Sequence, residues 1–391
     1  MAGISLGRGA DVKGIGHNRL NSVFILSKSS QLVGDCNSDP GSIRFWSLEN
    51  GKLNDVIQLD KNEFSSSIAV SPDESLIAVG TFTLKSRERE GGSYGTTNRS
   101  IGCYSIKEKK WLWKVKVEGT SGDCAGCDFK VAFTSDNNKV LAAGIRYILT
   151  FDAKTGELSK KQEDPLDNYS ASVHSKKMGK IFSPSAKYFV VWQEKPREGH
   201  EILSGLFINK RVTVWDMEKN ERIAYWEKDK PICSATVTPD EKNIIIGSMD
   251  GYIRIWSLSE QKIIREWKSH WRSKYPDNKK DINAITSISP DSRYLATSGD
   301  GDKRFNVKIW DYATGNLVHE FSETAFSVEY CGDYPMVFSN DGKYFAFQNW
   351  GNLCLYDTQT WKEKWCVPSW PEDNGKMWRY EQRPGKGFSI R

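Results

Sequence analysis

Short stretches of alternating apolar and polar residues, separated by turn-forming residues, run through the chain. In the clearest one, residues 244–256, an isoleucine-rich run leads into Asp250-Gly251, and an alternating stretch follows that ends at Trp256. Alternation with a period of two is typical of β-strands, and Asp-Gly between two apolar runs favours a two-residue turn because both residues tolerate positive φ angles. The segment predicts a β-hairpin whose second strand ends in an aromatic residue.

An aromatic-ended strand of this kind occurs seven times in the 391 residues. A tight turn of the type Ser71-Pro72-Asp73 lies upstream of most of them, so each unit reads as four antiparallel strands. One such sheet cannot bury both faces alone, and radial stacking leaves only short, protected edges. The repeat therefore predicts an all-β fold, a closed seven-bladed β-propeller of four-stranded antiparallel blades. The seven aromatics are Trp46, Tyr104, Phe151, Trp215, Trp256, Trp310 and Tyr356.

The units form one large body with two short flanks. No segment rich in Gly, Ser or Pro separates them, which predicts a single propeller domain over residues 21–367. Residues 1–20 could lend a strand to ring closure, but the seventh unit is already complete when it ends at Val367, which favours a loosely attached N-terminal arm. Residues 368–391 read as a C-terminal tail rich in aromatic and basic residues.

Two of the units end in a Trp-Asp pair, and a Gly-His pair lies ahead of the first: Val214-Trp215-Asp216, Ile309-Trp310-Asp311 and Gly16-His17. These motifs resemble the WD-repeat β-propeller family, whose repeat of roughly 40–45 residues ends in Trp-Asp. The resemblance covers about residues 16–367, although three units lack the Trp and most lack Gly-His. It is nearly silent on function, because one fold carries many functions.

The resemblance also implies structural roles for individual residues. The family's buried His–Ser/Thr–Asp–Trp hydrogen-bond network is expected in the sixth unit, where its members would be His270, Ser298, Asp300 or Asp302, and Trp310. The other residues with an implied structural role are Trp46, Trp215, Asp216, Trp256 and Asp311.

Long insertions fall only between the second and third strands of a unit or between one unit and the next. They comprise residues 84–98, expected to be a mobile loop, and residues 159–180, 193–210 and 268–281. In an antiparallel four-stranded blade these connections share one face of the disc, here the long-loop face, and the tight turns share the other, the short-turn face. Insertions gathered on one side often mark the binding face.

The charge of the chain is concentrated on that face. Lys and Arg exceed Asp and Glu by eight over residues 84–100, 159–180, 193–211 and 268–281, whereas the whole chain carries +5. Two other connections on the same face, 118–128 and 322–334, are acidic. The face would therefore have basic and acidic sectors, which permits an anionic partner without requiring one.

Aromatic and basic residues in the insertions are the candidate contacts, because Trp, Tyr and Arg dominate the energetics of many interfaces. Trp271 has the alternative of folding back over the rim as loop core, and Arg87 and Arg89 the alternative of a solvated loop. The candidate partner-binding residues are Trp271, Arg272, Lys274, Tyr275, Lys279, Lys280, Arg87, Arg89, Tyr94 and Phe207.

Motifs for metal binding or catalysis are missing from the sequence. Cys124-x-x-Cys127 has no second pair to complete a zinc site, so two reduced loop thiols, no metal and no cofactor are expected. No phosphate-binding loop, nucleophile elbow or His-Glu-x-x-His motif is present, which favours a non-enzyme. Cys103, Cys233 and Cys354 fall in predicted strands, where we expect buried free thiols. With no signal peptide and no 18-residue apolar run, these features predict a cytoplasmic protein without a membrane span.

Three functional hypotheses follow. The favoured one is a non-catalytic protein–protein interaction module or scaffold that presents the long loops to one or more proteins, as a subunit or adaptor of a larger complex. The alternative is nucleic-acid or polyanion binding by the basic sector, with stacking on Trp271 and Tyr275. The third is a propeller enzyme with a site in the central channel, although the sequence indicates no small-molecule substrate.

Overall fold

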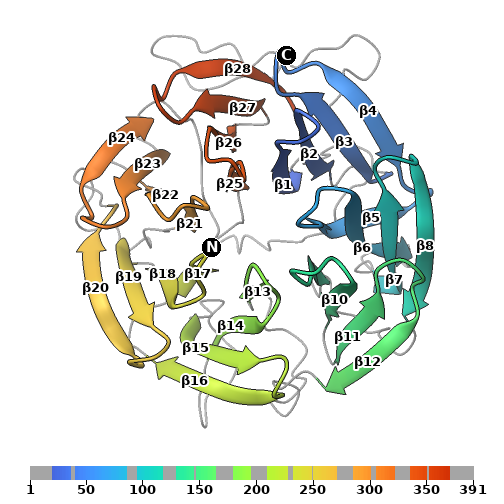
Figure 1. The fold of residues 1–391 in the computed structure, drawn as a ribbon, viewed down its shortest axis with the longest axis horizontal. Coiled ribbons are helices and arrows are strands. Elements are labelled where there is room, and N and C mark those ends of the chain that lie inside the picture. Colours follow the sequence, from blue (N-terminus) through green and yellow to red (C-terminus); the bar gives the residue numbers. More distant parts are fainter. Residues whose placement is uncertain are drawn as a thin grey trace, which may run out of the picture.

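The computed structural model shows a ring of seven four-stranded sheets around a central axis (Figure 1). Each sheet pairs its strands consecutively and antiparallel, so the predicted closed seven-bladed propeller is confirmed. The structure describes residues 20–36, 40–85, 95–117, 129–144, 147–163, 179–194, 209–227, 232–248, 250–270, 285–300, 305–321, 335–349 and 352–369.

The first and second strands of the blades, a and b, lie nearest the axis (Figure 1). The a strands are β1 (Leu20–Leu26), β5 (Glu63–Val70), β9 (Lys130–Phe133), β13 (Gly179–Phe182), β17 (Ile232–Val237), β21 (Ile285–Ile288) and β25 (Met336–Phe338). The b strands are β2 (Gln31–Cys36), β6 (Leu76–Lys85), β10 (Lys139–Ala143), β14 (Tyr188–Glu194), β18 (Asn243–Ser248), β22 (Tyr294–Asp300) and β26 (Tyr344–Asn349).

The third and fourth strands, c and d, form the outer part of each blade. The c strands are β3 (Ser42–Ser47), β7 (Gly95–Ser105), β11 (Tyr147–Asp152), β15 (Asn209–Asp216), β19 (Tyr252–Ser257), β23 (Phe305–Asp311) and β27 (Asn352–Asp357). The d strands are β4 (Leu53–Gln58), β8 (Lys110–Val117), β12 (Leu158–Glu163), β16 (Glu221–Glu227), β20 (Lys262–Lys268), β24 (Leu317–Phe321) and β28 (Glu363–Pro368).

The seven aromatics of the repeat occupy one position, the penultimate residue of strand c. At each of them the pairing with strand d shifts by one residue, a bulge that the alternation of the sequence does not reveal. Trp256 is 1% exposed and Trp46 2%, whereas Trp215 is half-buried. The repeat marker is therefore a core residue in most blades.

The core is divided among the junctions between blades. Seven clusters of buried apolar side chains each draw on two neighbouring blades, so no blade has a core of its own. The ring closes in the same way: a cluster that includes Leu20, Trp46 and Trp365 joins the last blade to the first. Blade 7 takes all four of its strands from residues 336–368.

A second contact recurs at the rim of the ring. In each blade, the strand c residue directly before the repeat aromatic pairs with a residue of strand d. At six of the seven junctions, the side chain of that strand d residue contacts the c–d turn of the next blade. The six contacts are Trp113 to the Ala153 carbonyl, Lys160 to the Met217 carbonyl, Arg265 to the Tyr312 and Ala313 carbonyls, Trp365 to the Leu48 carbonyl, Asp55 to the Lys109 ammonium group, and His319 stacked on Trp361.

Several predicted boundaries were wrong. The expected mobile loop at 84–98 is strand at both ends, because β6 and β7 extend their pairing to Lys85 and Gly95, and only 86–94 lie outside the described residues. Residues 159–163 belong to β12. In the hairpin at 244–256, β18 ends at Ser248 and β19 begins at Tyr252, so the two-residue turn was wrong; of Asp250 and Gly251, only Gly251 has a positive φ, 77°.

The cysteines also differ from the prediction in one case. Cys36, Cys103 and Cys233 are buried and form no disulfide, and burial raises the pKa of the Cys103 thiol to about 12. Cys354, predicted as a buried free thiol, is instead joined to Cys366 in a disulfide between β27 and β28. The sequence did not show this pairing, because it depends on the register of the two strands.

Candidate functional site

The described part of the candidate site consists of the residues that hold the backbone where the long loops leave the propeller. We call these groups of residues anchors. The predicted contact residues lie outside the described residues: Trp271, Arg272, Lys274, Tyr275, Lys279, Lys280, Arg87, Arg89, Tyr94 and Phe207. The chain is described up to His270 on one side of the fourth insertion and from Ile285 on the other. The geometry at His270 therefore decides how firmly that insertion is held.

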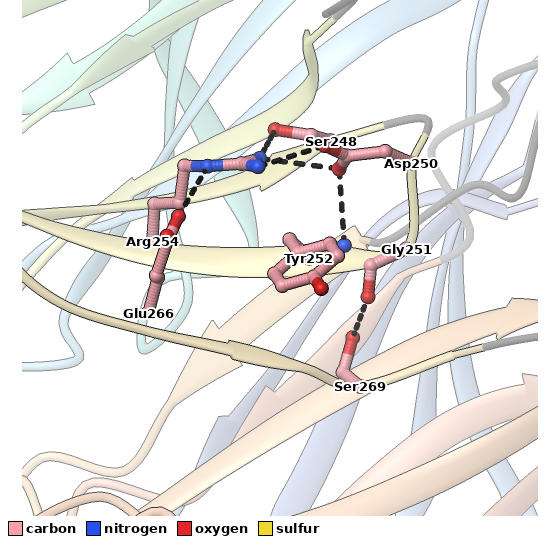
Figure 2. Close-up of polar contacts among 7 residues, drawn as sticks. All are labelled: Ser248, Asp250, Gly251, Tyr252, Arg254, Glu266 and Ser269. Carbon is pink, nitrogen blue, oxygen red and sulfur yellow. Dashed lines mark hydrogen bonds and ion pairs between the residues drawn. The ribbon is translucent and has the colours of Figure 1, made fainter.

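A buried arginine organises the blade 5 side of this anchor (Figure 2). Arg254, on β19, is 4% exposed, and its guanidinium donates to Ser248 Oγ at 2.8 Å, to Asp250 at 3.1 and 2.7 Å, and to Glu266 at 2.9 Å. Burial acts to raise the pKa of Asp250, but the hydrogen bonds and charge of Arg254 outweigh it and hold that pKa below its usual range. The Asp250-Gly251 turn is thereby fixed to the sheet by an ion pair.

The backbone of the Asp250-Gly251 turn holds the start of the insertion at 268–281. The Gly251 carbonyl accepts hydrogen bonds from Ser269 N at 2.8 Å, Ser269 Oγ at 3.0 Å and His270 N at 3.1 Å. Figure 2 shows Ser269 directly below the turn, at the end of β20. Ser269 and His270 are both fully buried. Both residues fall within the predicted insertion 268–281, although His270 was also expected in the buried network, and both are part of the folded body.

His270 then links the anchor to blade 6. Its Nε2 is 2.9 Å from Thr297 Oγ1, which also accepts a hydrogen bond from Trp310 Nε1 at 2.8 Å, and its Nδ1 is 3.0 Å from Asn306 Oδ1. Because an amide oxygen can only accept, Nδ1 carries the proton and Nε2 accepts from the threonine hydroxyl. The result is a neutral imidazole with both nitrogens paired.

One member of the expected network differs from the prediction, and the side chains of the two candidate acidic members, Asp300 and Asp302, lie outside the described part of the structure. The hydroxyl comes from Thr297 and not from Ser298, because neighbouring residues of a strand face opposite sides of the sheet. Ser298 Oγ is buried and has no hydrogen-bond partner among the described residues. The imidazole Nδ1 pairs with the Asn306 amide.

The charge state of His270 follows from its surroundings. Burial, with a smaller contribution from the Lys308 ammonium group, lowers the pKa of His270 to about 3. Lys308 is itself buried and donates to the Ser269 carbonyl at 3.1 Å. At neutral pH the anchor therefore combines a neutral histidine with a buried lysine that holds the adjacent backbone.

An equivalent anchor lies at the end of blade 7, where the C-terminal tail begins. Ser369 is 1% exposed, and its carbonyl accepts a hydrogen bond from Arg44 Nη1 at 2.8 Å. Its hydroxyl accepts from Gln348 Nε2 at 3.0 Å, and Gln348 Oε1 accepts from Leu20 N at 3.1 Å. Arg44 of blade 1 thus does for Ser369 what Lys308 of blade 6 does for Ser269.

Sequence reasoning missed this arrangement although it had a signal. Arg44, Arg254 and Lys308 all stand two residues before the aromatic, in Ile-Arg-Phe-Trp, Ile-Arg-Ile-Trp and Val-Lys-Ile-Trp. A cation at an inward position of a strand is rare unless it is paired. The pattern therefore predicts a buried acceptor, which the structure shows to be a serine carbonyl or an aspartate.

The short-turn face has a different construction. Its a–b turns satisfy their own polar groups, as in the Ser71 hydroxyl that donates to Asp73 at 2.6 Å. Glu241 accepts from Ser185 N and Oγ of the preceding blade at 2.8 and 2.7 Å, so it holds two blades together. The Lys242 side chain, by contrast, is 79% exposed. Lys242 is therefore a residue of this face that can be changed without removing a buried contact.

Few of the described residues suggest chemistry. One group, Cys354, Glu363 and Cys366, brings together three side chains of the kinds that bind metals, and it lies on blade 7 away from the axis. Within the described ranges, no helix is long and apolar enough to cross a membrane.

Comparison with known proteins finds a matching family model and a related protein. The family described as "WD domain, G-beta repeat" matches residues 223–257 and 264–311, which run from β16 through β19 and from β20 through β23. Protein groucho of Drosophila melanogaster is 30% identical over 133 residues, which make up 32% of this chain and 17% of groucho. The chain thus matches less than a fifth of that protein's length.

Proposed function

Because the chain is a WD-repeat β-propeller, a fold that serves generally as a protein-interaction scaffold, we propose that it binds protein partners through the loops of its long-loop face. It would do so as a non-catalytic subunit or adaptor of a larger complex. The observation that carries the proposal is the construction of the anchors, where buried charged and polar side chains hold the backbone from which the loops leave.

The energetic argument concerns rigidity. Buried ion pairs and charge-assisted hydrogen bonds are costly to bury and add little to stability over an apolar core, so their benefit is a fixed geometry. A binding loop loses less entropy on association when its ends are already held in place. The anchors at Ser269 and Ser369 have this property. They support a role for the adjacent segments 271–284 and 370–391 as presented binding elements.

The test compares partner capture by two variants of the full chain. The first replaces residues 271–280 with a short Gly-containing turn and keeps Ser269 and His270, which belong to the folded body. The second is Lys242→Glu, a charge reversal at an exposed position of the short-turn face. Both should unfold as cooperatively as the unmodified protein, because neither change removes a buried contact.

We expect the first variant to lose the proteins that the unmodified chain retains from its native source, as identified by mass spectrometry, and the second to keep them. Loss in the Lys242→Glu variant with retention in the loop variant would refute the proposal. Capture that weakens steeply with salt and disappears after nuclease treatment would favour the polyanion alternative.

A further inference from the structure

Blade 7 places three metal-ligating side chains together at its outer edge. Sγ of Cys354, Sγ of Cys366 and a carboxylate oxygen of Glu363 all lie within 4.8 Å of one another. Cys354 on β27 is buried, whereas Cys366 and Glu363 on the edge strand β28 are exposed. The site is therefore open to solvent on one side.

The register of the two strands brings the group together. Cys354 pairs directly with Cys366. Glu363 is three residues before Cys366 and would face the opposite side of a regular strand, but the bulge opposite Tyr356 inserts Lys364 and brings both residues to one side. The bulge thus completes the group.

We propose that Cys354, Cys366 and Glu363 form a redox-gated site for a thiophilic divalent cation such as Zn²⁺. In the oxidised protein the two sulfurs are bonded to each other and do not bind a cation. In the reduced protein the two thiolates and the carboxylate take up the metal, and a water molecule completes the coordination.

Gating requires a reductant such as a dithiol, and the exposed sulfur decides where the dithiol attacks. Its first thiolate attacks Sγ of Cys366 and displaces the sulfur of Cys354, and its second thiolate then releases Cys366, so that the reductant leaves as a disulfide. Two electrons and two protons pass to the cysteines. Binding of the cation then releases one proton from each thiol.

The dimensions of the group suit a tetrahedral cation. Zn–S bonds of about 2.3 Å and Zn–O bonds of about 2.0–2.2 Å place the ligand atoms roughly 3.5–3.8 Å apart. Atoms already within 4.8 Å reach that spacing by side-chain rotation, without movement of the strands. Soft thiolates select zinc over magnesium or calcium.

The site also has a place in the architecture. β28 carries Trp365 and precedes Ser369, and both of these residues hydrogen-bond blade 1 at the ring closure. In the reducing compartment that the sequence predicts, the dithiol form would prevail and the cation would take over the cross-link between β27 and β28. Because the folded chain binds the metal and the unfolded chain lacks the assembled site, binding stabilises the closing blade.

The test uses the full chain with Cys124→Ser and Cys127→Ser, which removes the Cys-x-x-Cys pair as a competing ligand. The protein is reduced with a phosphine, checked for its fold by circular dichroism and titrated with Co²⁺. We expect one equivalent of Co²⁺ to produce a thiolate-to-metal charge-transfer band that Zn²⁺ abolishes, and the oxidised protein to produce none.

Variants then assign the ligands. Cys366→Ser should abolish the band and Glu363→Gln should weaken binding about tenfold or more, whereas Cys233→Ser, at a buried thiol of blade 5, should leave both unchanged. Zn²⁺ should raise the melting temperature of the reduced chain but not of the oxidised one. A reduced, folded protein without the band, or a band that survives Cys366→Ser, would overturn the proposal.

Discussion

Two junctions, between blades 5 and 6 and between blades 7 and 1, hold the backbone in the same way where a segment leaves the ring, but they use different side chains. In both, a buried serine directly follows strand d, and a cation of the following blade donates to its carbonyl: Lys308 to Ser269, and Arg44 to Ser369. Beyond that point they diverge. Blade 6 continues through His270 and Thr297, whereas blade 7 uses the amide of Gln348.

The comparison separates what the repeat requires from what each blade adds. The backbone position of the serine carbonyl is common to both junctions, so the cation two residues before the aromatic is the repeated element. The side chains around it are interchangeable, provided that every buried polar group finds a partner. A histidine network and a glutamine amide therefore serve one purpose, to fix the backbone where a segment leaves the ring.

The largest expected effect comes from the rim position of the closing junction. Trp365 fills this position with a buried indole, whereas Arg265 fills it between blades 5 and 6 with a half-buried guanidinium. Trp365→Ala should reduce the free energy of unfolding by about 3–5 kcal/mol, as expected for a large buried aromatic. Arg265→Ala should cost less, about 1–2 kcal/mol. Denaturant titration measures both, and equal losses would contradict the assigned roles.

A smaller effect distinguishes two neighbouring residues of β22. Thr297→Val keeps the shape of the side chain but leaves His270 Nε2 and Trp310 Nε1 without their partner, which should cost about 2–4 kcal/mol. Ser298→Ala removes a hydroxyl that has no partner among the described residues and should change stability by no more than about 0.5 kcal/mol. A larger loss for Ser298→Ala would restore the network predicted from the sequence.

The smallest effect is a pH dependence confined to the histidine junction. The pKa of His270 is lowered in the folded protein to about 3, so the unfolded chain binds a proton that the folded chain does not. The contribution of His270 to the free energy of unfolding is fully present above about pH 6.5, which is its pKa in the unfolded chain. It falls by at most about 1.4 kcal/mol per pH unit as the pH drops toward 3.

Asp35 and His319 also contribute to the pH dependence of stability, so the measurement is a difference. Burial raises the pKa of Asp35, which makes its contribution fall as the pH rises, and burial lowers the pKa of His319. The free energy of unfolding is compared between the unmodified chain and His270→Asn from pH 7.5 to 4.5, because the contributions of Asp35 and His319 cancel in the difference. The unmodified chain should lose stability more steeply toward low pH, and parallel curves would show that the folded protein accommodates the charged imidazole.

The fold was predictable because it depends on features that repeat. The position of Trp256 and its six equivalents indicated the number of blades. Asp216 and Asp311, for which the resemblance implied a structural role, accept hydrogen bonds from the backbone of their c–d turns. The anchors were not predicted. Whether Thr297 or Ser298 faces His270 depends on which side of β22 each residue occupies, and a one-residue difference reverses that.

The candidate site was predictable to a smaller extent for a related reason. Cation positions such as Arg44 could be read from the repeat, but their acceptors are backbone carbonyls, which no side-chain pattern reveals. The Cys354–Cys366 pairing depends on the β27–β28 register. Contacts of Trp271 and the other loop residues with a partner stay a prediction, because loop sequences carry no periodicity from which their conformation follows.

The most direct test of the central claim is amide hydrogen exchange with and without a partner identified by capture. The account predicts that binding slows exchange at the long-loop ends of the blades, around Gly251, Ser269 and Ser369, and leaves the a–b turns at 71–76 and 238–243 unchanged. Protection confined to those a–b turns would show that the partner binds the short-turn face and would contradict the account.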